Sequence, residues 1–174
     1  WYEDQIGHPA FAARFGGDAY ILNASRGGGI LASKWYDAED IHRCFDALSN
    51  AHPPKELQQI IKEGTQVSVA NTFNTLHRTL IRGVASPFLH ARFVQVLWGA
   101  YYDTGKITSE RVDKYEQLIT YRNWASHHPV LCGIIRITDE VLFPMMGLKN
   151  VRVTGLQCVS TGADACAHSI TWTD

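Results

Sequence analysis

The fold of this chain is decided by residues 151–172, which read VRVTGLQCVSTGADACAHSITW. Val151 and Val153 alternate with polar residues, a pattern typical of a half-buried strand. The residues from Ser160 to Asp164 are those that turns prefer. A last strand follows, and one of its faces carries Cys166, His168, Ile170 and Trp172. The stretch therefore predicts a closing β-hairpin.

The segment before this hairpin predicts a helix that begins at Pro129. Its apolar positions include Leu131, Ile135 and Leu142, and Pro144 should kink or end it. Residues 106–122 are rich in Ile, Val, Thr and Tyr, which favours a strand pair or one long strand. A short helix capped by Ser109 is the alternative for that segment.

The first hundred residues predict mostly α-helix. Asp37 is a good N-cap for a helix that begins near Ala38, and Pro54 begins another. Helical spacing continues after Gly64, and a further helix starts at Pro87. The expected fold is α+β, with a helical N-terminal half packed on a small antiparallel sheet, followed by a helix and a β-hairpin.

Composition places the chain among ordinary globular domains, and we expect residues 1–174 to form one domain. Its 174 residues are 45% hydrophobic and 19% charged, with a formal net charge of −1. This balance argues against a nucleic-acid partner and against a polybasic membrane anchor. No apolar stretch approaches the roughly 18–20 residues of a membrane span, and no export signal is visible. We therefore expect a cytoplasmic protein with reduced thiols.

The motifs of common enzyme sites are missing. The chain has neither an H-E-x-x-H helix nor a G-x-S-x-G elbow. The run Arg26-Gly27-Gly28-Gly29-Ile30 lacks the spacing of a phosphate-binding loop and fits a flexible loop or a strand junction. No residues suggest a nucleophile, a base and an oxyanion hole together, so we expect a protein that is not an enzyme.

Three late cysteines form the strongest candidate site. Cys158 and Cys166 flank the predicted turn, and Cys132 lies in the helix before the hairpin, so their sulfurs can converge. Zinc needs about four nitrogen or sulfur ligands. His128, four residues before Cys132, and His168, on the strand face of Cys166, are candidates for the fourth ligand. Three buried thiols without metal are the alternative, because cysteine packs as a small hydrophobe.

The C-terminal segment resembles the end of the 4-vinyl-reductase-type small-molecule-binding domain. The matching residues are Cys132, Gly147, Cys158, Gly162, Asp164 and Cys166. In this family, members that sense aromatic compounds bind zinc with three cysteines and a Glu three residues before the second cysteine. The cysteines correspond to Cys132, Cys158 and Cys166, but the Glu position is Gly155. The metal site implied by the resemblance therefore needs a substitute ligand or has been lost.

A longer resemblance is to an uncharacterised paralogous family of myxobacteria. The matching features include Gly105, Pro129, the segment 150–153, the two-cysteine turn and the final Ile170-x-Trp172. The wider superfamily also resembles heme–nitric oxide sensor domains and the palmitate-holding TRAPP subunits of vesicle-tethering complexes. The resemblance implies a sensory fold that leans to dimers, and a fold alone does not fix function.

A layer of helices on a small sheet leaves a pocket between the layers where the core is not filled. The candidate lining residues are large aromatics: Phe93, Trp98, Tyr101, Tyr102, Tyr121 and Trp124. They suit a small apolar or aromatic ligand, and the first hypothesis is a sensing module with a homodimer or a regulatory protein as partner. In a regular strand, Tyr121 and Trp124 would face opposite ways, so only one would line the pocket.

Two other hypotheses stay open. The second is an adaptor or dimerisation protein with a filled core. The third is a heme-based gas sensor, which requires a histidine on a helix that faces a large cavity. His77 and His90 are the best helical candidates, but both are more typical of satisfied or surface histidines. We therefore do not expect heme.

Overall fold

The computed structural model describes residues 1–15, 35–74 and 86–173. The chain forms two compact units, Trp1–Gly64 and Thr65–Asp174, which are described one at a time. No helix within the described ranges is long and apolar enough to cross a membrane. The glycine run at residues 26–30 and His77 lie outside the described residues.

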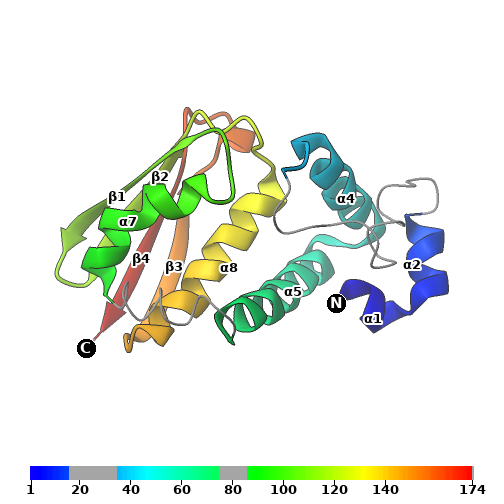
Figure 1. Cartoon of the computed structure of the whole chain (residues 1–174), viewed down its shortest axis with the longest axis horizontal. Helices are drawn as coiled ribbons and strands as arrows, with labels where there is room; N and C mark the ends of the chain where they lie inside the picture. Colours follow the sequence, from blue (N-terminus) through cyan, green and yellow to red (C-terminus); the bar gives the residue numbers. More distant parts are fainter. Residues whose placement is uncertain (16–34, 75–85, 174) are drawn as a thin grey trace. The chain divides into compact units, whose positions relative to one another are not determined.

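The described part of the first unit is helical (Figure 1). Its elements are α1 (Tyr2–Ile6), α2 (His8–Arg14), α4 (Ala38–Ala51) and the first part of α5 (Pro54–Asn74). Phe11 and Phe15 form its core, and the partly buried Cys44 and Leu48 of α4 pack against them. Cys44 therefore packs as a small hydrophobic residue, and it is not part of the cluster formed by the three late cysteines.

The second unit contains an antiparallel sheet with the strand order β1-β2-β4-β3. The strands are β1 (Lys106–Asp113), β2 (Glu116–Arg122), β3 (Lys149–Gln157) and β4 (Cys166–Thr173). In this order β4 crosses back to pair with β2, so Tyr121 lies opposite Cys166 and Ile119 lies opposite His168. The pairing brings the end of β2 beside the cysteine-bearing turn.

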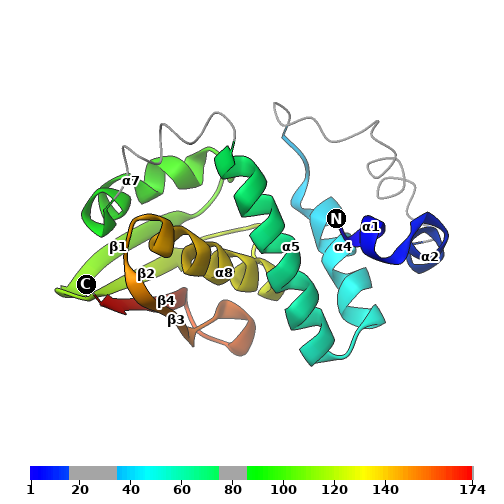
Figure 2. The same ribbon diagram turned by 90° about the horizontal axis from the view of Figure 1, so that it is seen from below.

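Helices α7 (Pro87–Gly99) and α8 (Pro129–Met145) cover the same face of this sheet (Figures 1 and 2). His90 of α7 contacts both Gln117 of β2 and Phe143 of α8, and Phe143 packs on Trp172 of β4. Phe143 is fully buried. The core of this unit therefore lies between the two helices and the sheet.

The α+β class, the helical N-terminal half and the closing hairpin are confirmed. Residues 106–122 form a strand pair, so the alternative of a short helix at Ser109 is wrong. One helix, α5, continues through Gly64, in agreement with the helical spacing that continues after this residue. Pro144 lies in the last turn of α8, which ends one residue later.

Gly105 precedes β1 with a φ of 92°, a conformation that residues with a Cβ rarely adopt. A Cβ there would lie 3.2 Å from the Cβ of Trp124 and 3.2 Å from Nε1 of Trp98. We expect Gly105→Ala to lower the free energy of unfolding by about 1–3 kcal/mol, measured by urea denaturation. Gly133→Ala is the matched control, because a Cβ at this helical glycine meets nothing within 4 Å. A loss in Gly133→Ala as large as that in Gly105→Ala would contradict the explanation.

Candidate functional site

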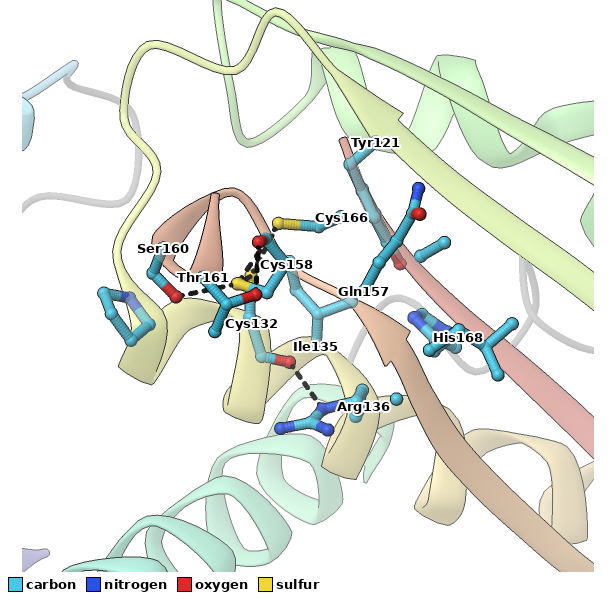
Figure 3. A pocket seen from close by; sticks show the side chains of 14 residues that line it. Tyr121, Cys132, Ile135, Arg136, Gln157, Cys158, Ser160, Thr161, Cys166 and His168 are labelled. Atoms are coloured by element: carbon cyan, nitrogen blue, oxygen red, sulfur yellow. Dashed lines mark hydrogen bonds between the residues drawn. The ribbon is translucent and has the colours of Figure 1, made fainter. Parts of the chain in front are cut away.

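The three late cysteines converge at the junction of α8 with the β3–β4 hairpin (Figure 3). The Sγ atom of Cys132 lies 3.4 Å from that of Cys166 and 3.8 Å from that of Cys158. The Sγ atoms of Cys158 and Cys166 are 3.5 Å apart. The sequence-based expectation that these thiols meet is therefore confirmed.

The fourth member of the cluster is His127, which the sequence analysis missed. Its Nε2 lies 3.2 Å from Sγ of Cys132 and 3.4 Å from Sγ of Cys158. The ring of Trp124 packs edge-on against the imidazole, at 5.7 Å between centroids. The ligand atoms of His127 and the three cysteines all lie within 4.8 Å of one another.

The two histidines proposed from the sequence are engaged elsewhere. His128 is the N-cap of α8, and its Nδ1 accepts a hydrogen bond of 3.1 Å from the backbone N–H of Val130. Nε2 of His168 lies 2.7 Å from Oδ2 of Asp139, and the His168 ring stacks on Tyr121. Neither belongs to the group of close ligand atoms, whose histidine is His127.

The turn between β3 and β4 holds two of the thiols by local hydrogen bonds. Residues Val159–Thr161 form a single 3₁₀ turn whose N-cap is Cys158. The N–H of Val159 donates to Sγ of Cys166 at 3.3 Å, and Oγ of Ser160 lies 3.0 Å from Sγ of Cys158. Gly162 ends the turn at a φ of 89°, which favours glycine.

The hydrogen bonds make the three thiols unequal acids. Burial by itself would raise the pKa of Cys158, but hydrogen bonds from Ser160, Cys166 and His127 outweigh it and lower the pKa to about 6. Burial raises the pKa of Cys132, and its hydrogen bond to Cys166 adds to this effect. Burial also raises the pKa of Cys166. Cys158 is therefore the most acidic of the three thiols.

This inequality predicts a pH dependence for alkylation of the metal-free chain. The rate at Cys158 should rise as the pH increases through about 6, because only the thiolate reacts, and it should level off above neutral pH. Cys132 should stay unmodified at pH 7, since its pKa is raised. Iodoacetamide labelling followed by peptide mass spectrometry measures both sites. Parallel pH profiles at the two cysteines would contradict the assignment.

The six aromatic residues proposed for a ligand pocket do not form one lining. Four of them pack on one another with ring centroids 4.3–6.4 Å apart: Trp98, Tyr102, Tyr121 and Trp124. Phe93 and Tyr101 are exposed on the surface. Asn123, at a φ of 54°, ends the regular strand, so Trp124 turns back toward Tyr121. Tyr121 is the member of the six that lines the cavity beside the thiols.

No protein-family model matches the sequence, and no curated protein matches it significantly. Solved structures do match. An H-NOX domain from Shewanella oneidensis in the Fe(II)CO ligation state aligns with a TM-score of 0.67 at 13% identity, over 99% of this chain and 93% of that one. The unliganded Fe(II) H-NOX protein from K. algicida also gives 0.67, at 11% identity, over 99% and 90%. The chain has the H-NOX fold.

This comparison confirms the expected likeness to heme–nitric oxide sensor domains at the level of the fold. At identities of 11–13% the comparison shows the fold alone, so the role of the chain is taken up as a proposal below. The likeness to 4-vinyl-reductase-type domains and to the myxobacterial family stays a prediction.

The sequence-based expectation about cofactors needs correction. It argued against heme, but the matching structures are H-NOX proteins in Fe(II), Fe(II)CO and Fe(II)NO states. Heme therefore has to be considered for this chain. The comparison gives the expectation of zinc no support.

Proposed function

We propose that this chain is a non-enzymatic sensory domain of signalling that responds to a small molecule. The support is the fold, because H-NOX structures align along 99% of the chain. The low identity of 11–13% means that the ligand has to be argued from this chain's own residues. A homodimer or a regulatory protein partner remains part of the proposal.

The functional centre that we propose is a single metal ion held by His127, Cys132, Cys158 and Cys166. The observation that carries it is the approach of four ligand atoms from separate segments to within 4.8 Å of one another. A tetrahedron with metal–sulfur bonds of roughly 2.3 Å has edges of roughly 3.8 Å. The three sulfur–sulfur distances, 3.4, 3.5 and 3.8 Å, are close to this value. Thiolate and imidazole ligands select soft or borderline transition metals.

A metal ion at this place would brace α8 against the β3–β4 hairpin. Cys132 comes from α8, Cys158 and Cys166 come from the hairpin, and His127 precedes the helix. Binding of the ion couples these elements, because the ligands are brought together only in the folded chain. The centre therefore stabilises the element that a sensed ligand could shift.

Cobalt(II) titration of the untagged, metal-free chain tests this centre. We expect thiolate-to-cobalt charge-transfer absorption that saturates at one equivalent, and elemental mass spectrometry should find one transition-metal ion in the chain as purified. Saturation should disappear in Cys132→Ser and persist in Cys44→Ser, whose thiol lies in the core of the other unit. Absence of the absorption in the reduced wild-type chain would refute the proposal.

Heme-dependent gas sensing is the second candidate, and the likeness to H-NOX structures in gas-bound states favours it. Among the described residues, His90 is the buried helical histidine. Its Nδ1 lies 3.3 Å from Nε2 of Gln117 and its ring packs on Phe143, while the described cavities do not include it. Burial lowers the pKa of His90, so the ring is a neutral core group. In this structure protein atoms surround the His90 ring, so heme ligation by this residue would require Gln117 and Phe143 to move.

Hemin titration of the chain, followed by reduction and carbon monoxide, separates the candidates. Heme binding would give a Soret band that shifts on addition of carbon monoxide. We expect His90→Ala to leave any such band unchanged, because protein atoms surround this ring. Loss of the band in His77→Ala would place the axial ligand at His77. An absent Soret band would remove the heme candidate and leave the metal centre to be judged by the cobalt titration.

A further inference from the structure

A groove of about 340 Å³ lies between α8 and the end of β3, next to the thiols (Figure 3). This volume falls in the range of small-molecule sites, roughly 300–1,000 Å³. Its apolar lining includes Pro129, Ile135 and Leu156, and Arg136 reaches into it from α8. The groove therefore combines apolar contact area with a fixed positive charge.

The guanidinium of Arg136 is only partly used by the protein. Its Nε donates to the backbone carbonyl of Cys132 at 3.3 Å. Among the residues that the structure describes, its terminal nitrogens have no recorded acceptor. Asp139 is engaged with His168, and Glu140, one helical turn further, forms no recorded ion pair with Arg136. Up to four N–H donors thus remain for a ligand.

Gly155 makes the room for this guanidinium. A Cβ at residue 155 would lie 3.3 Å from Cζ of Arg136 and would overlap Nη1. The glycine therefore leaves room for the guanidinium of Arg136, an exposed residue, among the residues that line the groove.

We propose that this groove binds a small organic carboxylate, which pairs with Arg136 and lays its apolar part against Ile135 and Leu156. The planar guanidinium matches a carboxylate with two parallel hydrogen bonds, and such charge-assisted bonds are the stronger kind. The apolar lining favours a carboxylate with a hydrocarbon part over a purely inorganic anion. The inference deepens the proposed sensing function by naming a ligand class, and it depends on that function for its biological output.

Chemical-shift titrations of the full chain with benzoate and with hexanoate test the proposal. We expect saturable shifts at Ile135, Arg136 and Leu156 with at least one of the two carboxylates. The neutral isosteres benzamide and hexanamide should bind about tenfold more weakly or worse, because they lack the charge that Arg136 recognises. Inorganic phosphate should also bind more weakly than the carboxylate, since it leaves the apolar lining bare.

Three variants sharpen this experiment. Arg136→Gln should weaken carboxylate binding about tenfold or more. Gly155→Ala should also weaken it, because the new Cβ displaces the guanidinium while the charge of the chain is unchanged. Arg152→Gln is the matched control, since Arg152 is exposed on β3 outside the groove lining, and it should leave the affinity unchanged.

Several results would overturn the inference: no saturable shifts with either carboxylate at millimolar concentration, equal binding of the amides or of phosphate, or unchanged affinity in Arg136→Gln.

Elemental analysis of the same samples distinguishes the failure of this inference from the failure of the proposed metal centre. Metal without carboxylate binding rejects the ligand class and leaves the metal centre in place. Carboxylate binding by a chain that binds neither metal nor heme supports the groove and rejects the proposed centre.

Discussion

Replacement of Cys158 by serine is expected to remove tight metal binding. When the free metal concentration is a thousandfold above the dissociation constant of the wild type, the free energy of unfolding should be about 4 kcal/mol lower in Cys158→Ser than in the wild type. The effect is large because the binding free energy adds to the folding free energy wherever the unfolded chain cannot assemble the site. Sγ of Cys158 lies 3.8 Å from Sγ of Cys132 and 3.5 Å from Sγ of Cys166. Its replacement would therefore leave the proposed site with three ligands.

Chemical denaturation with and without saturating metal measures this effect. The metal-dependent part of the stability should vanish in Cys158→Ser and persist in Ser160→Ala, which keeps all four ligands. The hydroxyl of Ser160 contacts the sulfur but belongs to an exposed residue, so its loss should cost about 1 kcal/mol or less. Equal metal-dependent stabilisation of the wild type and Cys158→Ser would show that the cluster is not a metal centre.

Replacement of Asp139 by alanine should destabilise the chain by about 3–5 kcal/mol. Asp139 and His168 are 5% and 2% exposed, and their side chains meet at 2.7 Å in the core between α8 and β4. Removal of the carboxylate leaves the buried His168 ring without this partner and opens a cavity. The ring is also held against Tyr121, so it cannot turn to solvent at small cost.

Urea denaturation with two companion variants checks this prediction. Glu140→Ala changes the neighbouring carboxylate, which is exposed, and should alter the stability by about 0.5 kcal/mol or less. Asp139→Asn keeps an acceptor for the imidazole N–H and should lose less than Asp139→Ala, so it gives a measurement even where the alanine variant does not fold. A loss below 1 kcal/mol in Asp139→Ala would mean that the pair contributes little to folding.

The elements of the second unit could be predicted from local patterns because each carries its own signal. The alternation at residues 151–153, the turn residues after Cys158 and the proline at residue 129 gave the hairpin and the start of α8. The order β1-β2-β4-β3 could not be derived in this way, because pairing between β2 and β4 depends on contacts between segments about fifty residues apart.

The fourth member of the cluster shows where residue spacing fails. Helical spacing favoured His128, four residues before Cys132, but the helix begins at Pro129 and His128 is its cap. The imidazole of His127 comes from the loop, where its position follows from packing on Trp124. The adjacent histidines before a proline were the available signal, and only the loop conformation separates their roles.

The directions of the aromatic side chains also depend on a detail that residue spacing does not give. Alternation along a strand predicted opposite directions for Tyr121 and Trp124, but the positive φ of Asn123 ends the strand between them. Both rings therefore enter one packed cluster with Trp98. The backbone conformation at Asn123 thus lets the Trp124 ring pack beside Tyr121.

The sequence by itself determined the α+β class and the positions of the helix and the hairpin that carry the three late cysteines, because periodicity, caps and turn residues act over a few neighbours. The tertiary structure alone decided that His127 joins the thiols, that His168 pairs with Asp139, and that Arg136 lies over Gly155. These outcomes depend on how α8 packs on the sheet, where distant segments compete for the same space and for the same hydrogen-bond partners.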